Sequence, residues 1–338
     1  MNRNRRKLLG LVGAVAGVGV GAAFMSHQAR HQDSPIVLRF SHVAAAHTPK
    51  GKAAQYFSDE VARASGGEVR IDVFPNSTLY KDGEELEALQ LGTVDIIAPS
   101  LSKLASIGLN GFAAFDLPFL FSDYDSLREI TDGPIGRKML KQLDHAGLVG
   151  KAFWDNGFKN MSATRPLLEV KDFNQVRMRI QPSKIIDLQM RLLGARTEDI
   201  ALSDLYDALA NGLVDGCENP PSNFLTQNLS PVQPFMTLSQ HGYLGNLMLV
   251  NSEFWAQLPR RIRSLLDDCI DAATRYATSI AKAENEQALG VIKGARMTTI
   301  VELSGRQRSD WKRTLMPVYQ QITDPVSLAL LEKVRRHS

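Results

Sequence analysis

VRMRI at residues 176–180 and VDGCENPP at residues 214–221 are the segments that reveal most about the fold of this 338-residue chain. Each is an apolar run that stops at a polar turn, which indicates a strand followed by a loop, and a helix is expected between them. Arg179 and Asn219 then lie where strands end, the edge at which open α/β sheets bind ligands. Because the paired N–H donors of a fixed arginine match the two oxygens of a carboxylate, Arg179 suggests an acidic ligand.

Strands alternate with amphipathic helices along most of the chain. Apolar or alternating runs predict strands at 36–41, 69–73, 94–98 and 149–154, and Pro49 after Thr48 predicts the start of the first helix. This order is typical of α/β folds with a parallel or mixed sheet.

One long helix is expected near the C-terminal end. From Pro259 to about Lys293, apolar residues recur every three or four positions. A helix of about 30 residues spans about 45 Å, which is longer than one lobe. We therefore expect this helix to brace two lobes.

An internal echo supports two similar lobes. ALQLGTVD at 88–95 matches ALANGLVD at 208–215 at five of eight positions, and both patterns predict a helix, a glycine stop and a strand. We expect the loops that follow, 99–103 and 216–220, to meet across a cleft. The expected bounds are residues 35–156 plus 245–284 for lobe I, and residues 157–244 plus 285–338 for lobe II.

The first 34 residues predict an export signal. Basic residues at 3–7 precede an apolar, glycine-rich run from Leu8 to Phe24, which is the order of a secretory signal peptide. Arg5 and Arg6 are adjacent, so both the twin-arginine route and the general secretory route fit. An uncleaved membrane anchor is a further alternative, because the apolar run approaches the length of a spanning helix.

Composition argues against several classes of function. Without the basic residues at 3–7, the chain carries 35 basic and 36 acidic side chains, so no basic face argues for nucleic acid. Cys217 and Cys269 have no His or Cys at metal-ligand spacing, and neither a metal nor another cofactor is expected. We expect two buried free thiols in preference to a disulfide.

A series of segments between residues 36 and 320 resembles the solute-binding proteins of TRAP transporters, the DctP family. The segments are FSHV (40–43), TPKG (48–51), FPNS (74–77), EALQLG (87–92), APSLSK (98–103), DLPFLF (116–121), NGFK (156–159), RIQPS (179–183), DGCENP (215–220) and HGYL (241–244). The resemblance implies a two-lobed α/β periplasmic-binding-protein fold with mixed sheets, which closes on an organic acid in an interlobe cleft. RIQPS and HGYL are most similar to the branch that binds C4-dicarboxylates such as malate, succinate and fumarate.

The resemblance also implies ligand-binding roles. Arg179 is the implied carboxylate clamp, Asn219 its polar partner, and Tyr243 belongs to the HGYL segment. Lys159 stands where some members carry a second arginine. From the residues alone, Lys159 could instead be a solvated loop charge and Asn219 a turn former. Arg177 lies two positions from Arg179 on the same side of the strand, and we expect it to be structural or at the surface.

Other candidate ligand contacts each have a structural alternative. Ser100 and Ser102 follow a strand, so either hydroxyl could bond a second carboxylate, while Lys103 could pair with a nearby acid. Trp154 ends a strand and is either a cleft wall or part of the core. His42 follows the first strand and either lines the cleft or is a buried core histidine.

The sequence therefore predicts a periplasmic binding protein and not an enzyme. A secreted hydrolase would need an activated nucleophile, and the chain has neither a G-x-S-x-G elbow nor an H-E-x-x-H motif. The expected partners of this monomer are a small organic acid and the membrane permease subunits of a TRAP transporter. A binding protein for a sugar acid or keto acid, and a sensor subunit, are the alternatives.

Overall fold

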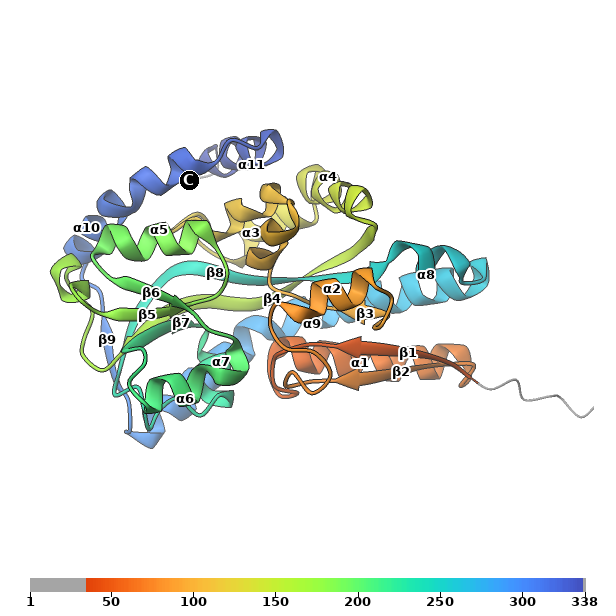
Figure 1. The fold of residues 1–338 in the computed structure, drawn as a ribbon, viewed down its shortest axis with the longest axis horizontal. Helices are drawn as coiled ribbons and strands as arrows, with labels where there is room; N and C mark the ends of the chain where they lie inside the picture. Colours follow the sequence, from red (N-terminus) through yellow and green to blue (C-terminus); the bar gives the residue numbers. More distant parts are fainter. Residues whose placement is uncertain (1–34, 337–338) are drawn as a thin grey trace, which may run out of the picture. The chain divides into compact units, whose positions relative to one another are not determined.

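The computed structural model describes residues 35–336, and the predicted export signal lies outside this range. The described strands form one mixed sheet in the order β2-β1-β3-β8-β4-β7-β5-β6, with β9 (Thr299–Glu302) beside β8. Two sets of three strands flank the centre (Figure 1). They are β1 (Ile36–Ser41), β2 (Val69–Phe74) and β3 (Ile96–Ile97), and β5 (Arg177–Ile180), β6 (Arg196–Asp199) and β7 (Gly216–Asn219).

The two sets repeat one structural unit. In each, the first strand lies in the middle and runs parallel to the other two. An aspartate before the third strand accepts a hydrogen bond from the main-chain N–H of an arginine on the first: Asp95 from Arg39 at 2.7 Å, and Asp215 from Arg177 at 2.9 Å. The echo between 88–95 and 208–215 thus reflects two lobes, lobe I around β1–β3 and lobe II around β5–β7.

Two long antiparallel strands, β4 (Leu148–Ala163) and β8 (Phe235–Asn251), connect the lobes. β3 pairs with one end of β8, and β7 pairs with the other end of β4. The β4–β8 register shifts at three places, one of them between Asp155 and Gly157. The sequence predicted only 149–154 of β4 as a strand, because these irregular strands lack a simple apolar alternation.

Four of the described helices connect strands within a lobe, two in each lobe. Helix α1 (Pro49–Ser65) begins as expected, with Thr48 Oγ1 accepting a hydrogen bond from Gly51 N at 3.2 Å. The other short helices are α2 (Glu84–Gln90), α3 (Tyr124–Thr131), α4 (Pro134–Gln142), α5 (Lys184–Leu193), α6 (Leu205–Ala210), α7 (Pro221–Thr226), α8 (Ser252–Gln257) and α10 (Gly305–Leu315). Between residues 35 and 336, no helix combines the length and the apolar character that crossing a membrane requires.

Helix α9 (Arg260–Ala295) is continuous over 36 residues, which confirms the predicted long helix. Its buried face packs against α1, β4 and α7. Because α1 belongs to lobe I and α7 follows β7 of lobe II, α9 braces both lobes, as expected.

The C-terminal helix α11 (Pro325–Arg335) packs against α3, α4 and the 3₁₀ segment η2 (Asn110–Asp116). Its Leu330 belongs to the same buried cluster as Phe112 and Phe115. Residues 285–338 are predicted from the sequence to belong to lobe II, whereas these contacts put α11 beside elements of the predicted lobe I. The lobe bounds themselves stay a prediction.

Candidate functional site

A small cavity lies between the lobes, at the carboxyl ends of the parallel strands. Its volume is about 40 Å³, which is room for about three water molecules. Lobe I contributes Val43, Ala44, Lys50, Asp82, Ser100 and Lys103; lobe II contributes Arg179, Gln181, Leu202, Glu218, Asn219 and Asn223; the connecting strands contribute Asn156, Lys159, Leu244 and Asn246. Segments 99–103 and 216–220 therefore both line one cavity, as the internal echo predicted, but residues 216–219 form strand β7 and not the expected loop.

Arg179 lies one residue before the end of β5, with its side chain buried in the cavity wall. Its Nε donates to the carbonyl oxygen of Ile200 at 2.7 Å, and one terminal nitrogen lies 3.8 Å from Asp82 Oδ2. The main chain thus fixes one edge of the guanidinium, which pre-orients the fork for a planar anion. Asn219 lies on the neighbouring strand β7, with its Nδ2 3.4 Å from Cys217 Sγ.

Asp82 connects the two lobes. Its carboxylate pairs with Lys103 of lobe I and accepts a hydrogen bond from the main-chain N–H of Leu202 in lobe II at 2.7 Å. Lys103 also donates to Glu85 Oε1 at 2.6 Å, which confirms its expected pairing with nearby acids. Burial opposes ionisation of Asp82, but Lys103, Arg179 and the Leu202 N–H hold its pKa at about 2.

Lys159 reaches the cavity already paired with a carboxylate. Its Nζ donates to Glu218 Oε1 at 2.5 Å, and Glu218 Oε2 lies 2.8 Å from His241 Nε2. His241 Nδ1 lies 2.7 Å from Ser239 Oγ. Burial opposes ionisation of Glu218, yet Lys159 and His241 bring its pKa to about 2. Burial lowers the pKa of His241, so we assign the neutral ring, donating to Glu218 and accepting from Ser239.

Positive charge predominates in the cavity wall. The basic lining side chains are Lys50, Lys103, Lys159 and Arg179, against the carboxylates of Asp82 and Glu218. Lys50 Nζ donates to the carbonyl oxygen of Ala98 at 3.0 Å. Burial, partly offset by Glu85, lowers the pKa of Lys50 to about 8. Arg179 and Lys50 come from different lobes, so cations face the cavity from two sides.

Ser100 is in the cavity wall, whereas Ser102 and His42 are not. Ser100 Oγ donates across the lobes to Gln181 Oε1 at 2.7 Å. Ser102 Oγ instead donates to the buried Asp116 at 2.5 Å, because the 3₁₀ turn after Ser100 directs it away from the cavity. His42 is completely buried, as the core alternative requires, but neither of its ring nitrogens has a hydrogen-bond partner within the described residues, so it is not a satisfied core histidine.

Trp154 and Tyr243 are also behind the wall. Trp154 is completely buried, and its Nε1 donates to Thr274 Oγ1 on α9 at 3.0 Å. The Tyr243 hydroxyl donates to Asp155 Oδ1 at 2.6 Å. Both side chains therefore pack within the protein in this conformation, which matches the core alternative for Trp154.

Sequence reasoning missed several polar residues of the wall. Asp82 and Lys50 gave no signal of their own, because each gains its partners only when distant segments fold together. Asn156 and Asn246 lie on β4 and β8, whose register shifts a single sequence does not reveal.

No group of three or more His, Cys, Asp or Glu side chains within residues 35–336 is arranged to hold a metal ion. The structure also places both cysteines in buried positions. Cys217 and Cys269 are free thiols with no disulfide between them.

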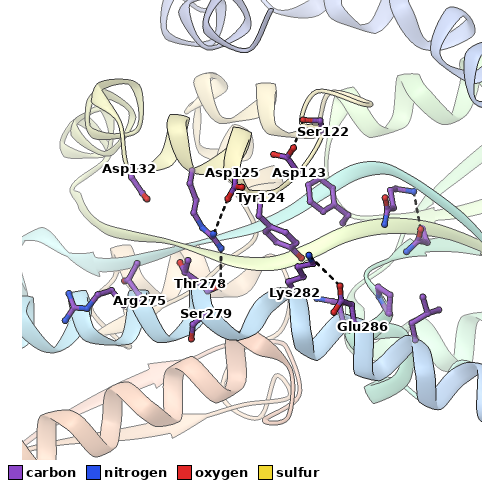
Figure 2. Close-up of a pocket in the computed structure, with 18 of the residues that line it drawn as sticks. Ser122, Asp123, Tyr124, Asp125, Asp132, Arg275, Thr278, Ser279, Lys282 and Glu286 are labelled. Atoms are coloured by element: carbon purple, nitrogen blue, oxygen red, sulfur yellow. Dashed lines mark hydrogen bonds and ion pairs between the residues drawn. The ribbon is translucent and has the colours of Figure 1, made fainter. Parts of the chain in front are cut away.

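A larger hollow of about 820 Å³, the α3–α9 groove, lies between these two helices. Figure 2 shows Asp123 and Tyr124 at the start of α3 and, across the groove, Lys282 and Glu286 on α9. The lining includes five carboxylates and three basic side chains, namely Asp123, Asp125, Asp132, Asp271, Glu286, Arg128, Arg275 and Lys282. This negative surplus suits an organic acid less well than the interlobe cavity does.

Two lobes around a buried, predominantly cationic cavity define a binding protein for a small anionic solute. The family model for bacterial extracellular solute-binding protein, family 7 (DctP) matches residues 40–325. The C4-dicarboxylate-binding periplasmic protein DctP of Rhodobacter capsulatus is 44% identical over 330 residues, which are 98% of each chain. The chain therefore belongs to solute-binding protein family 7.

Solved structures agree with this assignment. A TRAP periplasmic solute-binding protein from Sulfurospirillum deleyianum with bound succinate is 35% identical with a TM-score of 0.86, covering 89% of this chain and 99% of that one. Another from Pseudomonas aeruginosa with bound L-malate is 34% identical with a TM-score of 0.83, covering 85% and 100%. A more distant protein from Xanthobacter autotrophicus, 26% identical with a TM-score of 0.83 and covering 88% and 99%, holds β-D-galacturonate.

Proposed function

We propose that this protein captures a C4-dicarboxylate in the periplasm and delivers it to the membrane permease of a TRAP transporter. The observation that carries the proposal is the pair of cationic walls, Arg179 in lobe II and Lys50 with Lys103 in lobe I. Cations on two sides suit a ligand with a carboxylate at each end. The relatives named for C4-dicarboxylates, and those solved with succinate and L-malate, support this chemistry.

The size of the cavity supports capture by movement of the lobes. About 40 Å³ is too small for a C4 acid, so the lobes must separate to admit it. The bonds from Asp82 to Leu202 and from Ser100 to Gln181 cross between the lobes and would break on opening. We propose Arg179, Asn219, Lys159 and Ser100 as ligand contacts when the lobes close again.

Calorimetry on ligand-stripped protein lacking residues 1–34 tests the function. Succinate, malate and fumarate should bind, whereas galacturonate and keto acids should bind weakly or not at all. Recovery of unchanged ligand after long incubation is expected of a carrier without turnover. Clear binding of a sugar acid, with no heat from any C4 acid, would contradict the proposed ligand class.

The export proposal has a separate test. A reporter fused to residues 1–34 should reach the periplasm. Replacing Arg5 and Arg6 with Lys should block the twin-arginine route but leave the general secretory route working, because the second needs only positive charge. A reporter that stays in the cytoplasm in both forms would contradict the signal-peptide prediction.

A further inference from the structure

Two buried amides in the wall of the interlobe cavity have atoms without a hydrogen-bond partner. Asn156 on β4 and Asn246 on β8 are 1% and 2% exposed. Asn156 Nδ2 donates to Asn223 Oδ1 at 2.9 Å, but Asn156 Oδ1 accepts nothing, and Asn246 Nδ2 donates to nothing within the described protein. An unpaired buried polar atom lowers stability, so these two atoms await a ligand or water.

The two amides lie between the cationic sides of the cavity. β4 and β8 are neighbours at the centre of the sheet, and the β4–β8 register places Asn246 opposite Trp154, two residues before Asn156. Arg179 lies on β5, which is two strands from β4 on one side. On the other side, Lys50 donates a hydrogen bond to the carbonyl oxygen of Ala98, which directly follows β3, the strand beside β8. A ligand with one carboxylate towards Arg179 and the other towards Lys50 therefore passes its central carbons over the amides.

We propose that Asn156 and Asn246 recognise the hydroxyl group of a 2-hydroxy C4-dicarboxylate such as malate, and that the site prefers this ligand to succinate. This inference rests on the proposed function. A hydroxyl has one donor and two acceptor positions, so it can donate to Asn156 Oδ1 while accepting from Asn246 Nδ2. One ligand atom then completes both amides, whereas the methylene of succinate completes neither.

Water is the competing occupant. A polar space with two partners can hold a water molecule, which would bridge the amides when succinate is bound. The ligand hydroxyl makes the same bonds without immobilising a separate molecule. The closed cavity measures about 40 Å³ in all, so a bound four-carbon chain leaves little space for a separate water molecule and the ligand hydroxyl is the favoured partner.

Calorimetry with L-malate, D-malate and succinate measures the preference. We expect one malate enantiomer to bind about 10- to 100-fold more tightly than succinate. Asn246→Leu keeps a similar side-chain volume and removes no side-chain hydrogen bond seen in the described protein. It should reduce the malate-to-succinate ratio to about 1–3 and leave the melting temperature of the ligand-free protein equal or higher.

Asn251→Leu provides the matched control. Asn251 is also a buried asparagine on β8, but its Nδ2 donates to the carbonyl oxygen of Leu89 at 2.9 Å, outside the cavity. This variant should lose stability and keep the ligand ratio. If Asn246→Leu fails to fold, Asn246→Ala, which cannot overfill the cavity, is expected to show the same loss of preference.

The outcomes separate this inference from the function on which it rests. Equal affinities for malate and succinate in the unmodified protein would overturn hydroxyl recognition but leave C4-dicarboxylate binding intact. A ratio that Asn246→Leu does not change would do the same. Failure of every C4 acid to bind would overturn both.

Discussion

Arg177 and Arg179 are two residues apart on β5, yet their surroundings differ completely. Arg177 is partly exposed and pairs with Asp215, with Nη2 to Oδ1 at 2.6 Å, as the equivalent Arg39 pairs with Asp95 in lobe I. Arg179 is buried in the cavity wall. The first pair stabilises a repeated structural unit, and the second arginine is available to a ligand.

Removing Arg179 should therefore weaken binding far more than removing Arg177. Arg179→Ala should reduce C4-dicarboxylate affinity by about 30- to 4000-fold, or about 2–5 kcal/mol, because a buried carboxylate loses its partner. Arg179→Lys should also weaken binding strongly, since an ammonium lacks the planar fork. Arg177→Ala should leave affinity nearly unchanged in the same calorimetry. A larger loss from Arg177→Ala would show that the clamp is misassigned.

Lys50 should couple ligand binding to proton uptake. Its pKa is about 8 in the ligand-free protein, and a bound anion favours the charged ammonium and raises this pKa. Protein at pH 9 should therefore take up a proton on binding, and affinity should fall as pH rises above about 8, at most tenfold per unit.

The uptake is measurable by titrating ligand at pH 7 and pH 9 in buffers with different ionisation enthalpies. Lys50→Met should bind more weakly at pH 7 and show no such uptake. Identical apparent enthalpies in all buffers at pH 9 would exclude the coupling.

At the scale of single residues, the sequence could predict which side chains reach the cavity wall where this depends only on a position near the end of a strand. Arg179, Asn219 and Ser100 reach the cavity wall because each lies close to the end of a strand, although the strand that ends at Asn219 begins at Gly216, where the sequence indicated a loop. Ser102 differs from Ser100 only by its place in a 3₁₀ turn, which the sequence does not distinguish from a loop.

At the scale of elements, the junction where β4 passes between the lobes depends on Gly157. This residue has φ +146°, and a Cβ there would lie 2.6 Å from Asn285 Nδ2 on α9. Asn285 Nδ2 donates to the carbonyl oxygen of Asn156 at 2.7 Å, and its Oδ1 accepts from Ser222 N at 3.1 Å. One side chain of α9 thus holds the junction strand and α7 together.

Gly157→Ala should lower the free energy of unfolding by about 1–3 kcal/mol, because the methyl group displaces Asn285 and the backbone angle is unfavourable. Gly290→Ala, on helix α9 together with Asn285, is the control. A Cβ at Gly290 meets no atom within 4 Å, so this variant should gain about 0.4–1 kcal/mol. Urea denaturation of both variants measures the difference. Equal stabilities would mean that the Gly157–Asn285 contact does not constrain the junction.

Regular elements followed the sequence closely, and irregular ones did not. The period of α9 identified a helix almost at its true bounds, and the strand that became β2 alternates cleanly because one face is buried. β4 and β8 carry register shifts and are buried on both faces over much of their length. Register shifts and burial on both faces each remove the alternation of apolar and polar residues that identifies a strand. The two strands that join the lobes could therefore not be predicted in full.

At the scale of the whole molecule, the narrow cavity predicts a change of shape on binding. The lobes should spend time apart without ligand and close around it, so saturating C4-dicarboxylate should reduce the radius of gyration in X-ray scattering. Arg179→Ala with the same ligand concentration should show no change, because the ligand does not bind. Superimposable curves with and without ligand in the unmodified protein would count against closure.

Helix α11 has a consequence for the order of events during synthesis. Leu330 completes a cluster that includes Phe112 and Phe115, more than 200 positions earlier in the chain. The segment with these two aromatic side chains is synthesised early, but the side chains are not fully buried until α11 has also been synthesised and has packed against them. Because contacts so distant in sequence form late, the lobe that begins first is completed last, and the nascent chain presents apolar surface to chaperones throughout translation.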